Sequence, residues 1–149
     1  MLFVLFQLDR DRYALPAKQV VEVIPLVVVK SLPGAPKGVS GLIDYRGRPV
    51  PVVDLCLLAL GRPSVLRLGT RLILTGLDDG RLLALLAENA TETMTRAESD
   101  FVAAGSGDAG ARYLGPVTRD DRGLVQRVEV MQLLSREVRE ALFTELAAL

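Results

Sequence analysis

Apolar runs separated by short polar breaks recur along the first half of the chain. Residues 2–8 are apolar except for Gln7, a charged stretch follows, and apolar residues resume at 13–15. Two apolar runs around such a break predict a β-hairpin. Residues 19–29 are rich in β-branched side chains, which favour strands. Because Pro25 interrupts this run, we expect two short strands there rather than one.

A loop and a second hairpin come next. Residues 30–38 contain two prolines and two glycines, which predict an irregular surface loop. Strands are predicted at residues 39–45 and 48–53, separated by a turn at Arg46 and Gly47. Glycine suits the positive φ that a tight hairpin turn requires.

A short helix is predicted near residues 54–60. Asp54 precedes the apolar run 55–60, and its carboxylate can accept hydrogen bonds from the free amides at a helix start. Gly61 stands where helices commonly end. We therefore expect Asp54 to have a structural role.

The second half begins with another strand pattern. Residues 71–77 and 81–88 flank a turn sequence and predict a third hairpin. Residues 89–111 are small and polar, which predicts a long exposed excursion without packed structure. Residues 113–117 and 124–130 are expected to form the last strand pair.

The hydrophobic period changes to that of a helix near the end of the chain. Apolar side chains recur every three or four residues at Met131, Leu134, Val138, Leu142 and Leu146. This spacing predicts an amphipathic helix near residues 131–146. Its apolar face can pack on the same domain or bind a partner, and the pattern leaves both interpretations open.

Composition narrows the class of protein. A chain of 149 residues suffices for one domain, or for two small lobes that share a core. Eighteen basic residues balance 18 acidic ones without a basic stripe, which argues against nucleic acid as a partner. The apolar runs are far shorter than the roughly 20 residues that cross a bilayer. A single cysteine and no secretory leader pattern predict a cytoplasmic protein.

Candidate chemistry is sparse. Histidine is absent, so the commonest general base and metal ligand are missing. Cys56 stands alone, without the second cysteine or the histidine of a zinc site. We therefore expect no catalytic residues, no cofactor and no metal, and we do not predict an enzyme.

Glu22 and Arg46 are the charged residues that stand out, because each interrupts an otherwise apolar segment. A buried charge is costly unless it is paired. The two side chains can pair across neighbouring strands, or both can point to solvent. Periodicity does not decide between these alternatives.

Residues 41–55, GLIDYRGRPVPVVDL, resemble the centre of the CheW family, which typically reads G-V-x-N-L-R-G-x-x-x-P-V-x-D-L. Residues 6–8, 13–15, 20–22 and 33–36 fit its upstream pattern. The second half matches weakly, since the family's aspartates near 85–89 and 127–129 are not plainly present.

The resemblance implies a mainly β fold of two intertwined five-stranded SH3-like barrels that share a core. It further implies one domain over residues 1–149. In this division the first lobe covers about 14–66, and the second covers about 67–130 together with the N-terminal strand. The C-terminal helix covers about 131–149.

The resemblance also implies a function. CheW-like proteins are non-enzymatic adaptors that couple the cytoplasmic tip of a methyl-accepting chemoreceptor to the regulatory domain of a CheA-like histidine kinase. They are cytoplasmic and are recruited to membrane-bound receptor arrays. The family's receptor-facing positions fall on Val20, Glu22, Gly41 and Arg46, which supports a Glu22–Arg46 pair on the receptor-facing surface.

Departures from the family pattern concern partner choice. Asp44 and Tyr45 replace the usual Asn-Leu beside Arg46, so we expect them to modulate which receptor is accepted. The divergent second half and the long final helix suggest a chemosensory pathway other than flagellar chemotaxis. The alternative function is a standalone SH3-like module that binds a small molecule in a pocket between its lobes.

Overall fold

The computed structural model describes residues 1–104 and 111–149. The strands are β1 (Leu2–Leu8), β2 (Asp11–Pro16), β3 (Val20–Ile24), β4 (Val39–Tyr45), β5 (Arg48–Asp54), β6 (Arg71–Gly76), β7 (Leu82–Thr95), β8 (Leu114–Asp120) and β9 (Gly123–Val128). The α-helices are α1 (Leu55–Leu60) and α2 (Arg136–Ala147). Short 3-10 turns include Ala17–Gln19, Glu98–Asp100 and Val130–Gln132.

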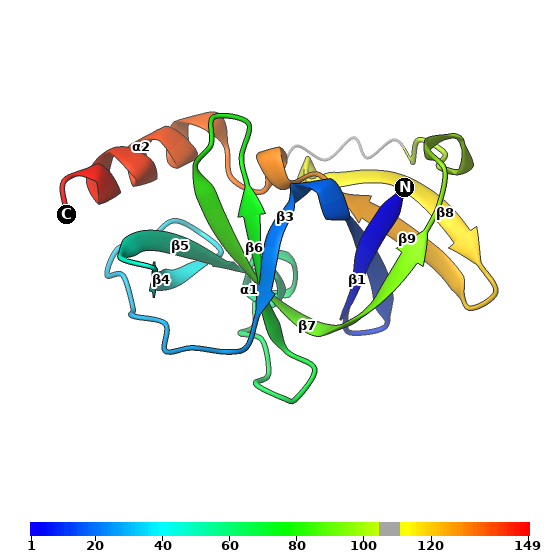
Figure 1. Ribbon diagram of the computed structural model, residues 1–149, viewed down its shortest axis with the longest axis horizontal. Helices are drawn as coiled ribbons and strands as arrows, with labels where there is room; N and C mark the ends of the chain where they lie inside the picture. The colour runs from blue at the N-terminus through cyan, green and yellow to red at the C-terminus, as the bar shows by residue number, and fades with distance from the viewer. Residues whose placement is uncertain (105–110) are drawn as a thin grey trace.

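The long strand β7 belongs to two five-stranded groups and joins them. Its first half pairs with β5 and β6, which gives the order β4-β5-β7-β6-β3. Its second half pairs with β1, which gives the order β7-β1-β2-β9-β8. Figure 1 shows β7 passing from one group into the other. The expected mainly β fold of two five-stranded units is therefore confirmed.

The ladders do not follow the lobe ranges expected from the sequence. We expected residues from 67 onward in the second lobe, whereas β6 pairs with β3 in the first group. Residues from about 14 were expected in the first lobe, whereas β2 pairs with β1 and β9 in the second group.

Neither group is a fully closed barrel among the described residues. In the first group the gap is bridged by the isolated pair of Lys30 with Leu42, whose two backbone hydrogen bonds are both 2.8 Å. In the second group Val102 and Val117 make the same kind of bridge, also with two bonds of 2.8 Å. In each group, one residue of the segment that follows an edge strand, rather than a strand ladder, thus pairs with the opposite edge.

The helix α2 packs on its own domain. Leu142 and Leu146 are buried and belong to the largest apolar cluster, which also contains Phe6, Ile73 and Leu85. Figure 1 shows α2 along the upper side of the first group, above β5. Its apolar face is therefore used mainly for the core.

The same helix begins later than its apolar spacing predicted. We expected a helix from residue 131, but α2 begins at Arg136 and Met131 lies in a 3-10 turn. The Ser135 hydroxyl accepts a hydrogen bond of 3.2 Å from the amide of Val138. This N-cap determines where the helix starts, because it satisfies an amide that has no partner within the helix.

The prediction of an unpacked excursion at residues 89–111 is wrong for its first part. Residues 89–95 continue β7 and pair with β1. In this ladder Glu92 pairs with Leu5 of β1, and Met94 pairs with Phe3 of β1. The segment is polar because much of it faces solvent, while its backbone is paired. The remainder of the predicted excursion includes residues 105–110, which lie outside the described residues.

Residues 19–29 contain one strand, β3, rather than the two that we predicted. After Pro25 the chain makes only the isolated bridge at Lys30. The predicted hairpins formed by β1 and β2, by β4 and β5, and by β6 and β7 are confirmed. The short helix with Asp54 as its N-cap and Gly61 at its end is also confirmed.

Candidate functional site

The turn between β4 and β5 holds the centre of the candidate site. Arg46 and Gly47 have φ values of 51° and 83°, as a two-residue hairpin turn with positive φ requires. The Asp44 carboxylate accepts a hydrogen bond of 2.8 Å from the amide of Gly47. This local geometry places the Arg46 side chain at the tip, where it is 77% exposed.

Tyr45 connects this turn to β3. Its hydroxyl donates a hydrogen bond of 2.7 Å to Oε2 of Glu22. The strands β3 and β4 share no backbone ladder, so this side-chain contact spans the gap in the first group. The bond to Glu22 raises the pKa of Tyr45, because the carboxylate favours the protonated phenol.

Arg46 completes a cluster of three side chains. Its Nη2 lies 4.0 Å from Oε2 of Glu22, and its Cζ lies 5.1 Å from the centroid of the Tyr45 ring. At such an exposed position an ion pair and a cation–π contact each contribute little to stability, because water screens the charges. Glu22 and Arg46 thus both face solvent and lie close together. The sequence left open whether they pair or point to solvent, and in the structure they do both.

Val20 and Gly41 have less exposed positions. Val20 begins β3 and is half-buried against the core. Gly41 is buried, and a Cβ atom at this position would lie 2.0 Å from the carbonyl oxygen of Lys30. Gly41 therefore shapes this surface by letting the Lys30 backbone lie against β4. Of the four positions expected to face the receptor, Glu22 and Arg46 are the ones brought together at the surface.

A second exposed surface was missed at the sequence level. Residues 61–70, between α1 and β6, expose Leu66 and Leu68 by 69% and 93%. The signal in the sequence was the Val-Leu-Arg-Leu run, which is apolar but lies outside any predicted strand. Only the structure shows that these side chains point outward.

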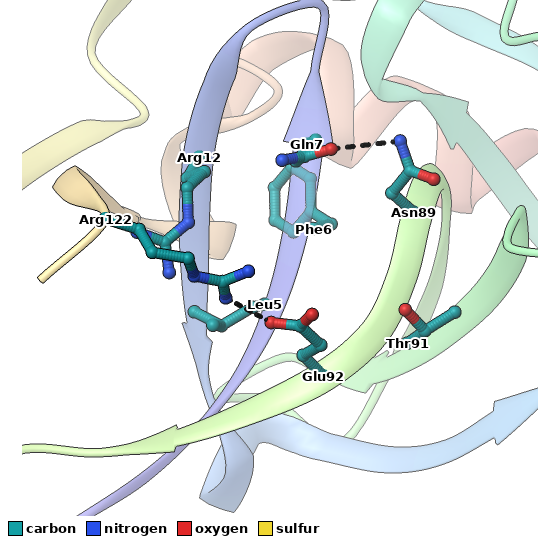
Figure 2. A pocket seen from close by; sticks show the side chains of 8 residues that line it. All are labelled: Leu5, Phe6, Gln7, Arg12, Asn89, Thr91, Glu92 and Arg122. Atoms are coloured by element: carbon teal, nitrogen blue, oxygen red, sulfur yellow. Dashed lines mark hydrogen bonds and ion pairs between the residues drawn. The ribbon is translucent and has the colours of Figure 1, made fainter. Parts of the chain in front are cut away.

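A small polar hollow lies on the second group, not between the two groups. It has a volume of about 260 Å³ and is lined by Leu5, Phe6, Gln7, Arg12, Asn89, Thr91, Glu92 and Arg122. Figure 2 shows Arg122 bonded to Glu92 and Asn89 bonded to Gln7. Arg12 makes two bonds of 2.7 Å to Asp120. The arginines of the hollow are therefore neutralised by protein carboxylates, and its volume is below the roughly 300 Å³ of small ligand sites.

Two further observations bear on the class of protein. Across residues 1–104 and 111–149, no cluster of three or more metal-ligating side chains occurs. Within the same part of the chain, neither helix has the length and apolarity needed to span a membrane.

The fold consists of two open five-stranded groups around a shared strand, and the conspicuous charges lie on an exposed hairpin. These features define a small SH3-like β protein suited to binding. The family model of the CheW-like domain matches residues 2–138, and the chain belongs to this family of chemotaxis scaffold and adaptor proteins.

The fold is similar to that in the crystal structure of the scaffolding protein TtCheW from Thermoanaerobacter tengcongensis. The match has a TM-score of 0.79 at 20% sequence identity and covers 90% of this chain and 87% of that one. No curated protein matches the chain. At this identity, the structural match shows the fold.

Proposed function

We propose that this protein is a non-enzymatic scaffold that couples the cytoplasmic tip of a chemoreceptor to a CheA-like histidine kinase. It acts in the cytoplasm and is recruited to membrane-bound receptor arrays through the receptor. The cluster of Glu22, Tyr45 and Arg46 carries this proposal, because it presents a solvent-exposed cation on a tight hairpin, beside Tyr45 and beside Glu22 of β3.

The receptor-facing surface comprises Val20, Glu22, Gly41 and Arg46. Arg46 is the residue available to a carboxylate of the receptor, since it is 77% exposed and its Nη2 lies 4.0 Å from Oε2 of Glu22, which is too far for a close hydrogen bond. Gly41 contributes by shape, and Val20 contributes its half-buried side chain at the start of β3.

Asp44 and Tyr45 set which receptor is accepted. Asp44 holds the turn through the amide of Gly47, and Tyr45 holds the Glu22 carboxylate. Both therefore determine where the Arg46 guanidinium is presented. The arrangement supports recognition of a receptor tip that differs from the tips recognised by relatives with Asn and Leu at these two positions.

Binding of receptor-tip fragments from the same organism tests this proposal. Arg46→Glu reverses the exposed charge, and we expect it to weaken receptor binding about tenfold or more, equivalent to roughly 1.4 kcal/mol. Arg10→Glu is the matched control, because Arg10 is also an exposed arginine, in the turn between β1 and β2. Unchanged binding by a natively folded Arg46→Glu protein would count against the proposal.

The divergent second half and the helix α2, which continues beyond the family match at residue 138, support a pathway other than flagellar chemotaxis. Deletion of the gene should then leave swimming chemotaxis intact while it changes another output of the cell. A loss of swimming chemotaxis would place the protein in the flagellar pathway instead.

A further inference from the structure

The loop of residues 61–70 exposes several large apolar side chains. Leu66 and Leu68 are 69% and 93% exposed, Val65 is 42% exposed, and Leu60 at the end of α1 is 41% exposed. Figure 1 shows this loop at the lower edge of the molecule, whereas α2 lies at the opposite edge and β4 and β5 lie at the left. The loop is therefore separate from the hairpin that carries Arg46.

Two polar side chains of the same loop, those of Ser64 and Thr70, point inward. Ser64 is 8% exposed, and both its amide and its hydroxyl donate to the Asp54 carboxylate, at 2.9 and 2.6 Å. Thr70 is 1% exposed and donates a bond of 2.6 Å to the carbonyl of Val65. These bonds hold both ends of the exposed segment.

Glu88 of β7 anchors the middle of the loop. Its carboxylate accepts a bond of 2.6 Å from the amide of Val65 and lies 3.1 Å from Arg62. Arg62 also reaches Asp9 of the second group, at 2.7 Å. The loop is thus attached to both five-stranded groups.

In this loop two polar side chains are buried and the leucines are exposed, which is the opposite of the usual arrangement in a surface loop. Four buried polar residues, Asp54, Ser64, Thr70 and Glu88, satisfy the loop from inside, while its leucines face water. Turning Leu66 and Leu68 inward would break these bonds and leave buried polar groups unsatisfied, which is costly. Exposed leucines that are held in place in this way mark a protein interaction site.

The charge on the loop indicates the chemistry of the partner. Arg67 is exposed between the two leucines and has no carboxylate partner among the described residues. The Arg62 charge is neutralised by Asp9 and Glu88. Arg71, which directly follows the loop and donates to the carbonyl of Leu68, likewise has no carboxylate partner among the described residues. Recognition of anionic lipid typically uses clusters of about 4–8 basic residues, so two such arginines favour a protein surface.

We propose that residues 61–70 form a second docking surface, which takes an apolar surface bearing a carboxylate on the regulatory domain of the CheA-like kinase. This inference rests on the proposed function, because a scaffold that couples two proteins needs a surface for the kinase away from the receptor-facing hairpin. Leu66 and Leu68 supply the apolar contact, and Arg67 supplies the charge.

Binding of the isolated kinase regulatory domain to the full chain tests the inference. We expect the double variant Leu66→Asp, Leu68→Asp to lose at least tenfold in affinity for this domain while receptor-tip binding is unchanged. Arg67→Glu should weaken kinase binding as well, since it faces the partner's carboxylate. Leu124→Asp is the matched control, because Leu124 is 59% exposed on β9, and it should bind both partners normally.

The outcomes separate this inference from the proposed function. If the wild type binds both partners and the folded double variant keeps its kinase affinity, the inference is wrong and the proposed function stands. If the wild type binds neither partner, the proposed function fails, and the inference fails with it. Binding to phosphatidylserine vesicles that is lost in the double variant, without a change in kinase binding, would overturn the inference in favour of a membrane surface.

Discussion

The hydroxyl of Tyr45 lies 2.7 Å from the Glu22 carboxylate and joins β4 to β3, two strands without a shared backbone ladder. A leucine, usual at this position in the family, could not form this bond. The tyrosine hydroxyl makes the close contact with the Glu22 carboxylate, while Nη2 of Arg46 is 4.0 Å from that carboxylate and the guanidinium lies over the tyrosine ring. The guanidinium is therefore held in place while its charge stays accessible to a partner.

The pKa of Tyr45 should report this contact directly. The hydrogen bond to Glu22 raises that pKa, so Glu22→Ala should lower it towards the ordinary value of about 10. Phenolate absorbance during a pH titration measures this shift, in a background where Tyr13 and Tyr113 are replaced by Phe. Glu140→Ala, on α2, is the control. An unshifted titration in Glu22→Ala would show that the contact does not form in solution.

Gly41→Ala should destabilise the protein more than Gly47→Ala. A Cβ atom at position 41 would lie 2.0 Å from the Lys30 carbonyl oxygen, which must move and break the bridge to Leu42. Overpacking of this kind costs about 1–3 kcal/mol. At position 47 nothing lies within 4 Å, so Ala meets only the strain of positive φ, about 1 kcal/mol. Urea unfolding compares the two, and equal losses would contradict the role given to Gly41.

Asp120→Asn should lower the free energy of unfolding by about 3 kcal/mol at neutral pH, because it leaves the Arg12 guanidinium without its carboxylate. The two side chains are only 10% and 15% exposed and share two bonds of 2.7 Å. Asp121→Asn, at an exposed neighbouring position, should have little effect. Thermal and urea unfolding measure both variants, and similar losses in the two would argue against this ion pair.

The same variant has a predicted pH dependence. The hydrogen bond from Arg12 holds the pKa of Asp120 well below its ordinary range. A carboxyl with a depressed folded-state pKa stabilises the protein above its unfolded pKa of about 4, and this contribution is lost as the pH falls further. The difference in unfolding free energy between the wild type and Asp120→Asn should therefore narrow below about pH 4. A constant difference down to low pH would be inconsistent with this assignment.

Asp54→Ala should cost about 2–4 kcal/mol of stability, because one carboxylate serves both a helix start and a loop. Asp54 is 3% exposed and accepts bonds from the amides of Cys56, Leu57 and Ser64 and from the Ser64 hydroxyl. Ser64→Ala removes only the hydroxyl bond and should cost about 1 kcal/mol. If calorimetry showed comparable losses of stability for Asp54→Ala and Ser64→Ala, capping of the helix would be the lesser part of the role of Asp54.

Features that depend on neighbouring residues were predictable from the sequence. The helix Leu55–Leu60 follows from Asp54 and Gly61 at its ends, because capping bonds form within a few residues. The hairpin of β4 and β5 follows from the turn at Arg46 and Gly47 for the same reason. The motif around this hairpin also led to the family, which the match over residues 2–138 confirms.

Features that depend on distant partners were not predictable in this way. The second half of β7 is polar and resembled a loop, but β1 supplies its backbone hydrogen bonds from about 90 residues away in the sequence. The start of α2 at Arg136 did not follow from the apolar spacing, because that spacing continues through the preceding turn, whereas Ser135 caps the helix.

The sequence by itself determined the strand-rich character of the chain, the capped helix, the hairpin that presents Arg46 and the family. The tertiary structure alone decided that Tyr45 binds Glu22 and that the loop 61–70 turns Ser64 and Thr70 inward and its leucines outward. The physical reason is the range of the interactions. Caps and tight turns close within a few residues, whereas Glu88 and Asp9 contact Arg62 of the loop from 26 and 53 residues away.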